Sequence, residues 1–307
     1  GSLFTLSRYI IFFFSFFIIL FLSIIINKTY LNFFLALSMA AILIESLFIN
    51  LMIFDYVIIN GNFLERSNDF RGFAGNINIS SFSILSKCII PIYILYTSKN
   101  KYLNIIAAIF ISSSFLSIFL LMSRGSILAA VLIFIIIGLN LVLSNKKKNY
   151  IRSIYLTICL CFSFLSYNLI NDKNITNLIS ERFATVANPQ SDDSVNERVN
   201  FSLAAISSIK DNPILGIGIG NWKIKSIELN KDIIQNYRIP YFVHNDFLQL
   251  AAEIGILGGL LYLFFVFYPV IFILKGLINS FKFDLNFFIL LIFTVFIVDS
   301  LINFPID

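Results

Sequence analysis

The segment Val243–Gln249 contains the only histidine of the 307-residue chain, in the order Val-His-Asn-Asp-Phe-Leu-Gln. His244 stands where a long polar segment gives way to a strongly apolar one, which places a titratable group at a predicted membrane–water boundary. Imidazole is the side chain that most often transfers protons near neutral pH. The pattern therefore indicates proton-transfer chemistry on a substrate that lies partly in lipid.

Three polar residues follow His244 on the predicted apolar helix. Asp246, Gln249 and Glu253 lie at positions i, i+3 and i+7, so they form one stripe on that helix. Carboxylates inside spans are costly and usually face the bundle interior or a wet cavity. We expect Asp246 to cap the helix, with Gln249 at the matching third position. The positive end of the helix dipole disfavours imidazolium, so a neutral, basic His244 is expected.

Three arginines are predicted to face the same compartment from separate parts of the chain. Arg71 lies in a glycine-containing loop, Arg124 in Ser-Arg-Gly between two spans, and Arg198 at the start of a loop helix. Arginine forks suit phosphate and pyrophosphate oxygens, so together these residues would form an anion clamp. The alternatives are contacts with lipid headgroups for Arg71 and Arg124, and a local ion pair with Glu197 or Asp193 for Arg198.

Long apolar helices must position these residues. Hydrophobic residues make up 58% of the chain and charged residues 13%, against about 45–50% and about 25% in soluble proteins. A span needs about 20 apolar residues. The sequence predicts an all-α polytopic transmembrane helical bundle with about eight spans: Tyr9–Ile26, Leu31–Phe54, Ile79–Thr97, Tyr102–Met122, Ser126–Leu143, Ile154–Ile170, Phe247–Leu274 and Leu285–Phe304.

Basic residues in short loops predict the orientation. Lys99 and Lys101, the cluster from Lys146 to Arg152, and Lys275 with Lys282 fall on one side, which should be cytoplasmic. Residues 1–170 then hold six spans, 171–246 form one large periplasmic loop with short helices, and 247–307 hold the last two spans. The net charge of +5 reflects this bias, and no nucleic-acid partner is expected.

The large loop contains one clear helix signal. Ser194–Glu197 matches a capping box and predicts a helix that runs to about Lys210. Asn212-Pro213 should end it, because the residue before a proline is disfavoured in α geometry. The helix is weakly amphipathic, so we expect it on the membrane surface or against the bundle.

Glycines mark two further places. Gly216–Gly220 predicts a tight turn at the interface, anchored by Trp222 at headgroup level. A dinucleotide fingerprint would require a preceding strand and a following acidic residue, which this context does not provide. Gly255 and Gly259 have the GxxxG spacing that lets a neighbouring helix approach closely.

Taken together, these motifs resemble the O-antigen ligase/polymerase superfamily of membrane glycosyltransferases that use undecaprenyl-diphosphate-linked glycans. The His-Asn…Leu-Gln…Glu-x-Gly block is the most specific of them. The carrying residues, in family order, are Arg71-Gly72…Gly75-Asn76-x-Asn78, Ser123-Arg124-Gly125, Glu197-Arg198, Pro213…Gly216-x-Gly218-x-Gly220-x-Trp222, His244-Asn245-Asp246-x-Leu248-Gln249…Glu253-x-Gly255 and Asn303-Phe304-Pro305.

The resemblance implies an inverting, metal-independent transfer at a periplasmic site of the bacterial inner membrane. It makes His244 the catalytic base and Arg71, Arg124 and Arg198 the binders of the diphosphate. Asn245, Asp246, Gln249 and Glu253 would support them. The partners would be the lipid-linked donor, the bilayer, and an acceptor that is lipid A-core, a growing glycan or a protein. No cofactor is expected, and no metal either, because the outer segment offers no second histidine and no cysteine.

Two charged residues inside predicted spans leave an alternative open. Glu45 and Lys87 would be costly if isolated, so they either pair structurally or mark an ion path. An ion path would favour a secondary transporter or a flippase for lipid-linked glycan, which typically has repeated halves and broken helices. A purely structural scaffold would leave His244 and the outward arginines unexplained.

Overall fold

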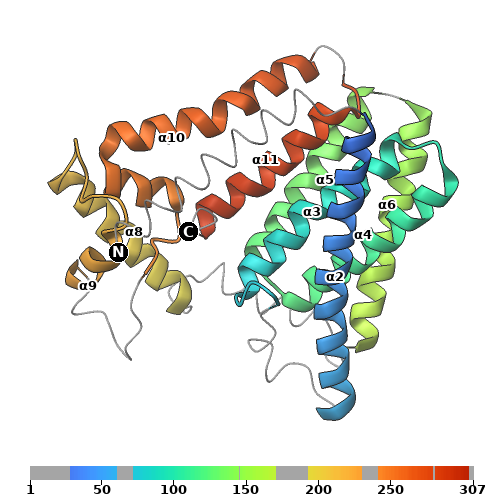
Figure 1. The fold of residues 1–307 in the computed structure, drawn as a ribbon, viewed down its shortest axis with the longest axis horizontal. Coiled ribbons are helices and arrows are strands. Elements are labelled where there is room, and N and C mark those ends of the chain that lie inside the picture. Colours follow the sequence, from blue (N-terminus) through green and yellow to red (C-terminus); the bar gives the residue numbers. More distant parts are fainter. Residues whose placement is uncertain are drawn as a thin grey trace. The chain divides into compact units, whose positions relative to one another are not determined.

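The computed structural model describes residues 28–60, 72–144, 146–170, 193–229, 241–278 and 281–303. These residues are mainly helical and contain no strand, which confirms the all-α prediction (Figure 1). The helices are α2 (Lys28–Asn60), α3 (Ile77–Thr97), α4 (Lys101–Leu121), α5 (Arg124–Ser144), α6 (Lys147–Ile170), α8 (Asp193–Asp211), α9 (Trp222–Leu229), α10 (Asp246–Ile278) and α11 (Leu285–Ile302). The span expected at Tyr9–Ile26 lies outside the described residues.

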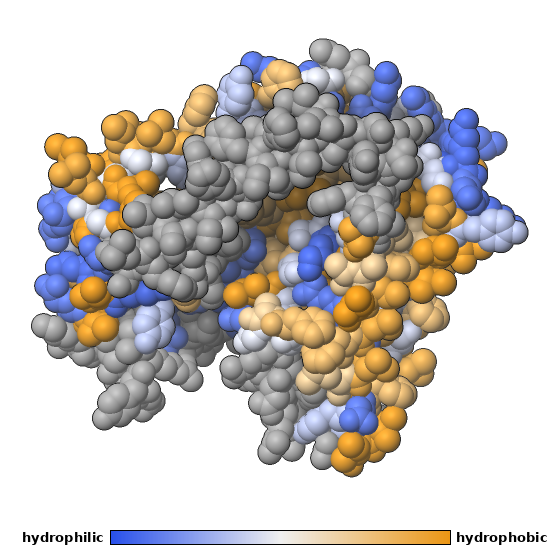
Figure 2. All heavy atoms as spheres, viewed as in Figure 1, coloured by the Kyte–Doolittle hydropathy of each residue, from blue (hydrophilic) through white to orange (hydrophobic). Residues whose placement is uncertain are grey.

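Seven helices within the described residues are long and apolar enough to cross a membrane: α2 to α6, α10 and α11. Each overlaps a predicted span. Large apolar side chains such as Leu139 and Val142 stay 59% and 68% exposed, as side chains that face lipid do. Figure 2 shows apolar residues over much of the visible face of these helices. The chain is therefore a multi-pass membrane protein.

The chain divides into two compact units, each of which is described by itself. The histidine unit consists of Gly1–Phe33, Ala184–Tyr268 and Ser300–Asp307. The bundle unit consists of Phe34–Phe183 and Pro269–Asp299.

Hydroxyl and amide side chains join the helices of the bundle unit. Ser81 of α3 and Ser126 of α5 lie 2.5 Å apart, oxygen to oxygen. On α2, Asn50 donates to Ser113 of α4 and accepts from Ser117 of α4 at 2.8 Å. Lipid leaves no hydrophobic drive for helices to associate, so close packing and such hydrogen bonds hold the bundle together.

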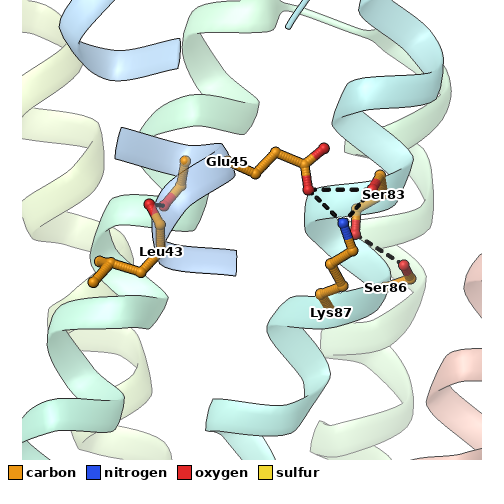
Figure 3. A network of polar contacts seen from close by, with 6 residues as sticks. Leu43, Glu45, Ser83, Ser86 and Lys87 are labelled. Carbon is orange, nitrogen blue, oxygen red and sulfur yellow. Dashed lines mark hydrogen bonds and ion pairs between the residues drawn. The ribbon is translucent and has the colours of Figure 1, made fainter. Parts of the chain in front are cut away.

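An ion pair lies within the spans of the bundle unit (Figure 3). The ammonium of Lys87 on α3 donates to Oε2 of Glu45 on α2 at 2.5 Å and to Ser83 Oγ at 2.8 Å. Ser83 also donates to the same Glu45 oxygen at 3.3 Å. Glu45 is buried. The structural pairing, one of the two interpretations that the sequence left open, is confirmed.

A small core holds the histidine unit together. The fully buried residues of this core are Ala205 of α8, Trp222 of α9, Ala252 of α10, and Val243 in the segment before α10. The predicted loop helix is confirmed as α8, although it begins at Asp193, ahead of the predicted cap Ser194, and ends at Asp211, two residues before Pro213. The expectation that Trp222 anchors the turn at the lipid interface is wrong, because the residue is fully buried in this core. The sequence pattern cannot distinguish these roles because tryptophan suits both.

Candidate active site

The start of α10 places the histidine. Asn245 Oδ1 accepts a hydrogen bond from the Leu248 amide at 3.1 Å, and the Asn245 carbonyl accepts from the Gln249 amide at 2.9 Å. These are the bonds of an N-cap residue. Asn245 therefore caps the helix, and the expectation that Asp246 does so is wrong. Asn and Asp cap about equally well, so sequence alone could not choose between them.

The backbone at His244 is held in an unusual conformation. Its φ is 60°, in the left-handed region that residues other than glycine seldom occupy, although His, Asn and Asp are enriched there. Directly before it, the buried amide of Val243 donates to Gln249 Oε1 at 3.1 Å. Gln249 thus ties the strained segment to the first turn of α10. Strain of this kind persists only where the surroundings enforce it, and it gathers at functional sites.

Helix α10 is broken at Gly255, which has φ 79° and ψ 172°. The ring of Phe247 lies 5.2 Å from that of Tyr262, whereas a straight helix would separate these residues by about 22 Å at about 1.5 Å per residue. The first turns of α10 therefore fold back along the part after the break. Residues 256–278 alone are long enough to span a membrane.

The loop after α8 fills the break. The amides of Ile217 and Gly218 donate to the carbonyls of Ala252 and Glu253 at 2.9 and 2.8 Å, and the Ile256 amide donates to the Pro213 carbonyl at 2.8 Å. A Cβ atom on Gly255 would lie 2.0 Å from the Ile214 carbonyl oxygen. Gly255 therefore admits a loop, and the prediction that it admits a neighbouring helix is wrong. The GxxxG spacing indicates that another segment packs closely against the helix, but it does not indicate whether that segment is a helix or a loop.

Glu253 fixes the glycine turn. Its carboxylate is buried and accepts from the Gly220 amide at 2.8 Å and from the Trp222 amide at 3.3 Å. Gly218 and Gly220 have φ values of 93° and 74°, which only glycine adopts freely. This backbone conformation directs the Gly220 and Trp222 amides toward the Glu253 carboxylate. The predicted tight turn is confirmed. Glu253 joins the turn that follows α8 to the helix that follows His244.

A pocket of about 370 Å³ opens beside the imidazole. Arg198 supplies a guanidinium, while Ser202 and Asn245 add smaller polar groups. The remaining walls are apolar: Val199 and Leu203 of α8, and Leu301 and Ile302 of α11. The pocket thus combines a cation, a proton acceptor and an apolar surface, which together suit the phosphorylated end of a lipid.

The surroundings keep His244 neutral. Burial lowers the pKa of its imidazole from 6.5 to about 4, and the positive charge of Arg198 contributes in the same direction. The lowered pKa that keeps His244 neutral therefore has two causes: burial is the larger and the neighbouring cation is the smaller. An anion bound at Arg198 would offset the effect of the Arg198 charge and so make the imidazole more basic.

The remaining predicted site residues that the structure describes do not line this pocket. Asp246, Gln249 and Glu253 are buried in the histidine unit. Arg124 belongs to the bundle unit, where Ser123 before it donates to Asn78 Oδ1 at 2.9 Å. That bond brings the Ser-Arg-Gly motif against the Asn-x-Asn motif that follows Arg71. Arg71 itself lies outside the described residues.

The sequence did not point to Phe201, although its ring lies beside the imidazole. The two ring centroids are 6.4 Å apart and the planes differ by 17°. Phe201 is three residues after Arg198, so both lie on one face of α8. The three-residue spacing from Arg198 was the one feature of the sequence that could have indicated Phe201 as a neighbour of the site. The pocket walls from α11 carried no such signal, because Leu301 and Ile302 look like any residues of a span.

Residues 106–263 of the chain match a family model described as O-antigen ligase. The match covers just over half of the chain. It includes Arg124, Arg198, and the segment from His244 to Glu253. No curated protein matches the sequence.

Proposed function

Because the chain belongs to the O-antigen ligase family, we propose that it transfers a glycan from undecaprenyl diphosphate to an acceptor hydroxyl on the periplasmic side of the bacterial inner membrane. The family and the spanning helices together identify the chain as a multi-pass membrane enzyme of the O-antigen ligase type. The donor, the acceptor, the side of the membrane and the residue roles are our proposal.

The pocket of the histidine unit carries this proposal. It joins the only histidine of the chain to a guanidinium and to apolar walls from two helices. The donor has matching parts: a diphosphate, a prenyl chain and a sugar whose bond to the diphosphate must break. A guanidinium suits the diphosphate oxygens, and a neutral imidazole suits the proton of an incoming hydroxyl.

In the proposed reaction, His244 removes the proton from the acceptor hydroxyl. The oxygen attacks the anomeric carbon from the face opposite the diphosphate, so that the configuration inverts. The bond from the anomeric carbon to the diphosphate oxygen breaks, and its electron pair leaves with the diphosphate. Arg198, together with Arg71 and Arg124, stabilises the charge that develops on the leaving group.

Buried polar residues support this centre. Asn245 caps α10, Gln249 holds the backbone before His244, and Glu253 holds the glycine turn. Asp246 is buried at the start of the same helix. We propose that these four residues position the base and take no part in bond making. The proposal also includes no metal ion and no cofactor, and it keeps residues 171–246 as the periplasmic loop that contains α8 and α9.

The test uses the purified protein in liposomes with a radiolabelled undecaprenyl-diphosphate glycan. Lipid A-core, a second lipid-linked glycan and a serine-containing protein are offered as acceptors in separate reactions. Transfer of label to one of them, unchanged after chelation with EDTA, is the expected result. Movement of the labelled lipid between leaflets without a glycosidic product would instead favour the flippase alternative.

A further inference from the structure

Helix α8 presents an aromatic ring to the proposed base. We propose that Phe201 is a positioning residue that fixes the plane of the His244 imidazole by lying parallel to it, so that a ring nitrogen stays directed at the acceptor hydroxyl. This inference rests on the proposed function. The arrangement of the two rings, whose centroids are 6.4 Å apart and whose planes are 17° from parallel, carries it.

The backbone of His244 is already fixed, so the orientation of the ring is what remains to be set. Gln249 holds the Val243 amide on one side, and the Asn245 cap holds the other. Between these anchors the left-handed backbone of His244 directs the side chain toward α8. Only rotation about the side-chain bonds can then misplace the imidazole nitrogens.

Helix α8 is well placed to stop that rotation. Ala205, one turn after Phe201 on the same face, is fully buried against Val243 and Trp222. The helix is therefore anchored to the residue that directly precedes His244. Movement of α8 away from His244 would require this core to open.

Stacking restrains the ring without blocking its chemistry. The Phe201 ring lies nearly parallel to the imidazole, whereas both imidazole nitrogens lie at the ring edge and keep their lone pair or hydrogen in the ring plane. Catalysis needs this restraint, because a misplacement of about 1 Å in a reacting group can reduce the rate about 100-fold. Phe201 also adds an apolar group beside His244, and burial is the main cause of the lowered pKa of His244.

Charged groups around the imidazole come from two helices. Arg198 faces it from α8, and its charge lowers the pKa of His244. Asp246 is two residues away at the start of α10. The α11 residues that line the pocket, Leu301 and Ile302, carry no charge. Phe201 therefore acts on the imidazole as an uncharged parallel ring, and Arg198 acts through charge.

The test exploits the single histidine of the chain, because its imidazole gives one set of NMR signals in ¹³C,¹⁵N-histidine-labelled protein. Phe201→Leu removes the ring, Phe201→Tyr keeps it, and Ile206→Leu is the control at an exposed position of the same helix. We expect Phe201→Leu to lower kcat about tenfold or more with KM nearly unchanged. The pKa of the imidazole should rise from about 4 toward 6.5. Phe201→Tyr and Ile206→Leu should both match the wild type.

Two results would overturn the inference: a wild-type kcat and imidazole pKa in Phe201→Leu, or equal losses in Phe201→Leu and Phe201→Tyr. If Phe201→Leu does not fold, Phe201→Met fills the space without a ring. The NMR readout needs no turnover. A protein that transfers no glycan would therefore contradict the proposed function, while the titration would still show whether Phe201 contributes to the burial that lowers the imidazole pKa.

Discussion

Two pairs of polar side chains, one in each unit, differ in whether their charges attract or repel. Glu45 and Lys87 in the bundle unit carry opposite charges and neutralise each other at 2.5 Å. Arg198 and His244 in the histidine unit would both be cations, and the charge of Arg198 helps to hold the imidazole neutral. The opposite charges of Glu45 and Lys87 stabilise each other within the spans, whereas Arg198 brings a positive charge to the wall of the pocket that contains His244. The first arrangement serves structure, and the second suits a substrate.

The sharpest contrast is expected from Arg198→Gln. Removing one donor that stabilises developing charge typically lowers the rate about 100- to 1,000-fold. We expect a loss of that size in kcat/KM for glycan transfer, with the same amount of folded protein in the membrane. Lys210→Gln, near the other end of α8, is the control. A wild-type rate in Arg198→Gln would mean that the pocket does not bind the diphosphate.

The ion pair should respond in the opposite way, in stability and not in catalysis. Removing one partner of an ion pair leaves the other charge without its partner and lowers stability, whereas removing both is often close to neutral. Glu45→Gln should therefore lower the melting temperature in detergent, and the double variant Glu45→Gln/Lys87→Gln should recover most of the loss. Transfer per folded molecule should not change. A loss of kcat in the double variant would give this pair a functional role.

Glu253 is the intermediate case, a carboxylate held by backbone amides in the histidine unit. Hydrogen bonds to a charged group contribute about 1.5–3 kcal/mol. Glu253→Gln keeps the shape but replaces one acceptor oxygen with an NH₂ group that faces an amide donor. We expect a loss of stability of that size, measured by thermal unfolding, and a smaller loss of transfer than in Arg198→Gln. Equal losses of transfer in the two variants would contradict a purely positioning role.

The smallest expected effect is a shift in pH dependence. The lowered pKa of about 4 keeps the imidazole in its base form above about pH 5, so kcat/KM should fall only as the pH drops through about 4. Arg198→Gln removes the lesser cause of the shift and leaves burial, so the fall should move upward but stay below 6.5. A wild-type fall near 6.5 would show an imidazole exposed to water.

The spans could be predicted because lipid imposes a simple rule on sequence. Long apolar runs predicted seven helices that the structure confirms, from α2 to α6 together with α10 and α11. The break at Gly255 could not be predicted, because it depends on loop amides that come from more than thirty residues earlier in the chain. Trp222 was misplaced for a related reason, since its burial depends on Ala205, Val243 and Ala252 coming together.

The sequence predicted the main charged and titratable residues of the site but not the residues that surround them. The sequence singled out His244 and Arg198, and the structure places them in one pocket. Their neighbours could not be read in the same way, because Phe201 and Leu301 are apolar residues among many. Asn245 and Asp246 are both good caps, and only the helix start distinguishes them. The roles of Arg71 and Arg124 remain predictions.

The central claim is that His244 accepts the proton of the acceptor hydroxyl, and His244→Asn tests it most directly. Asparagine tolerates the left-handed backbone at this position, so the variant should fold where alanine would add strain. Loss of a general base typically lowers the rate about 100- to 10,000-fold. We expect glycan transfer to fall by at least the lower figure, with unchanged binding of undecaprenyl diphosphate. Transfer at the wild-type rate by folded His244→Asn would contradict the account.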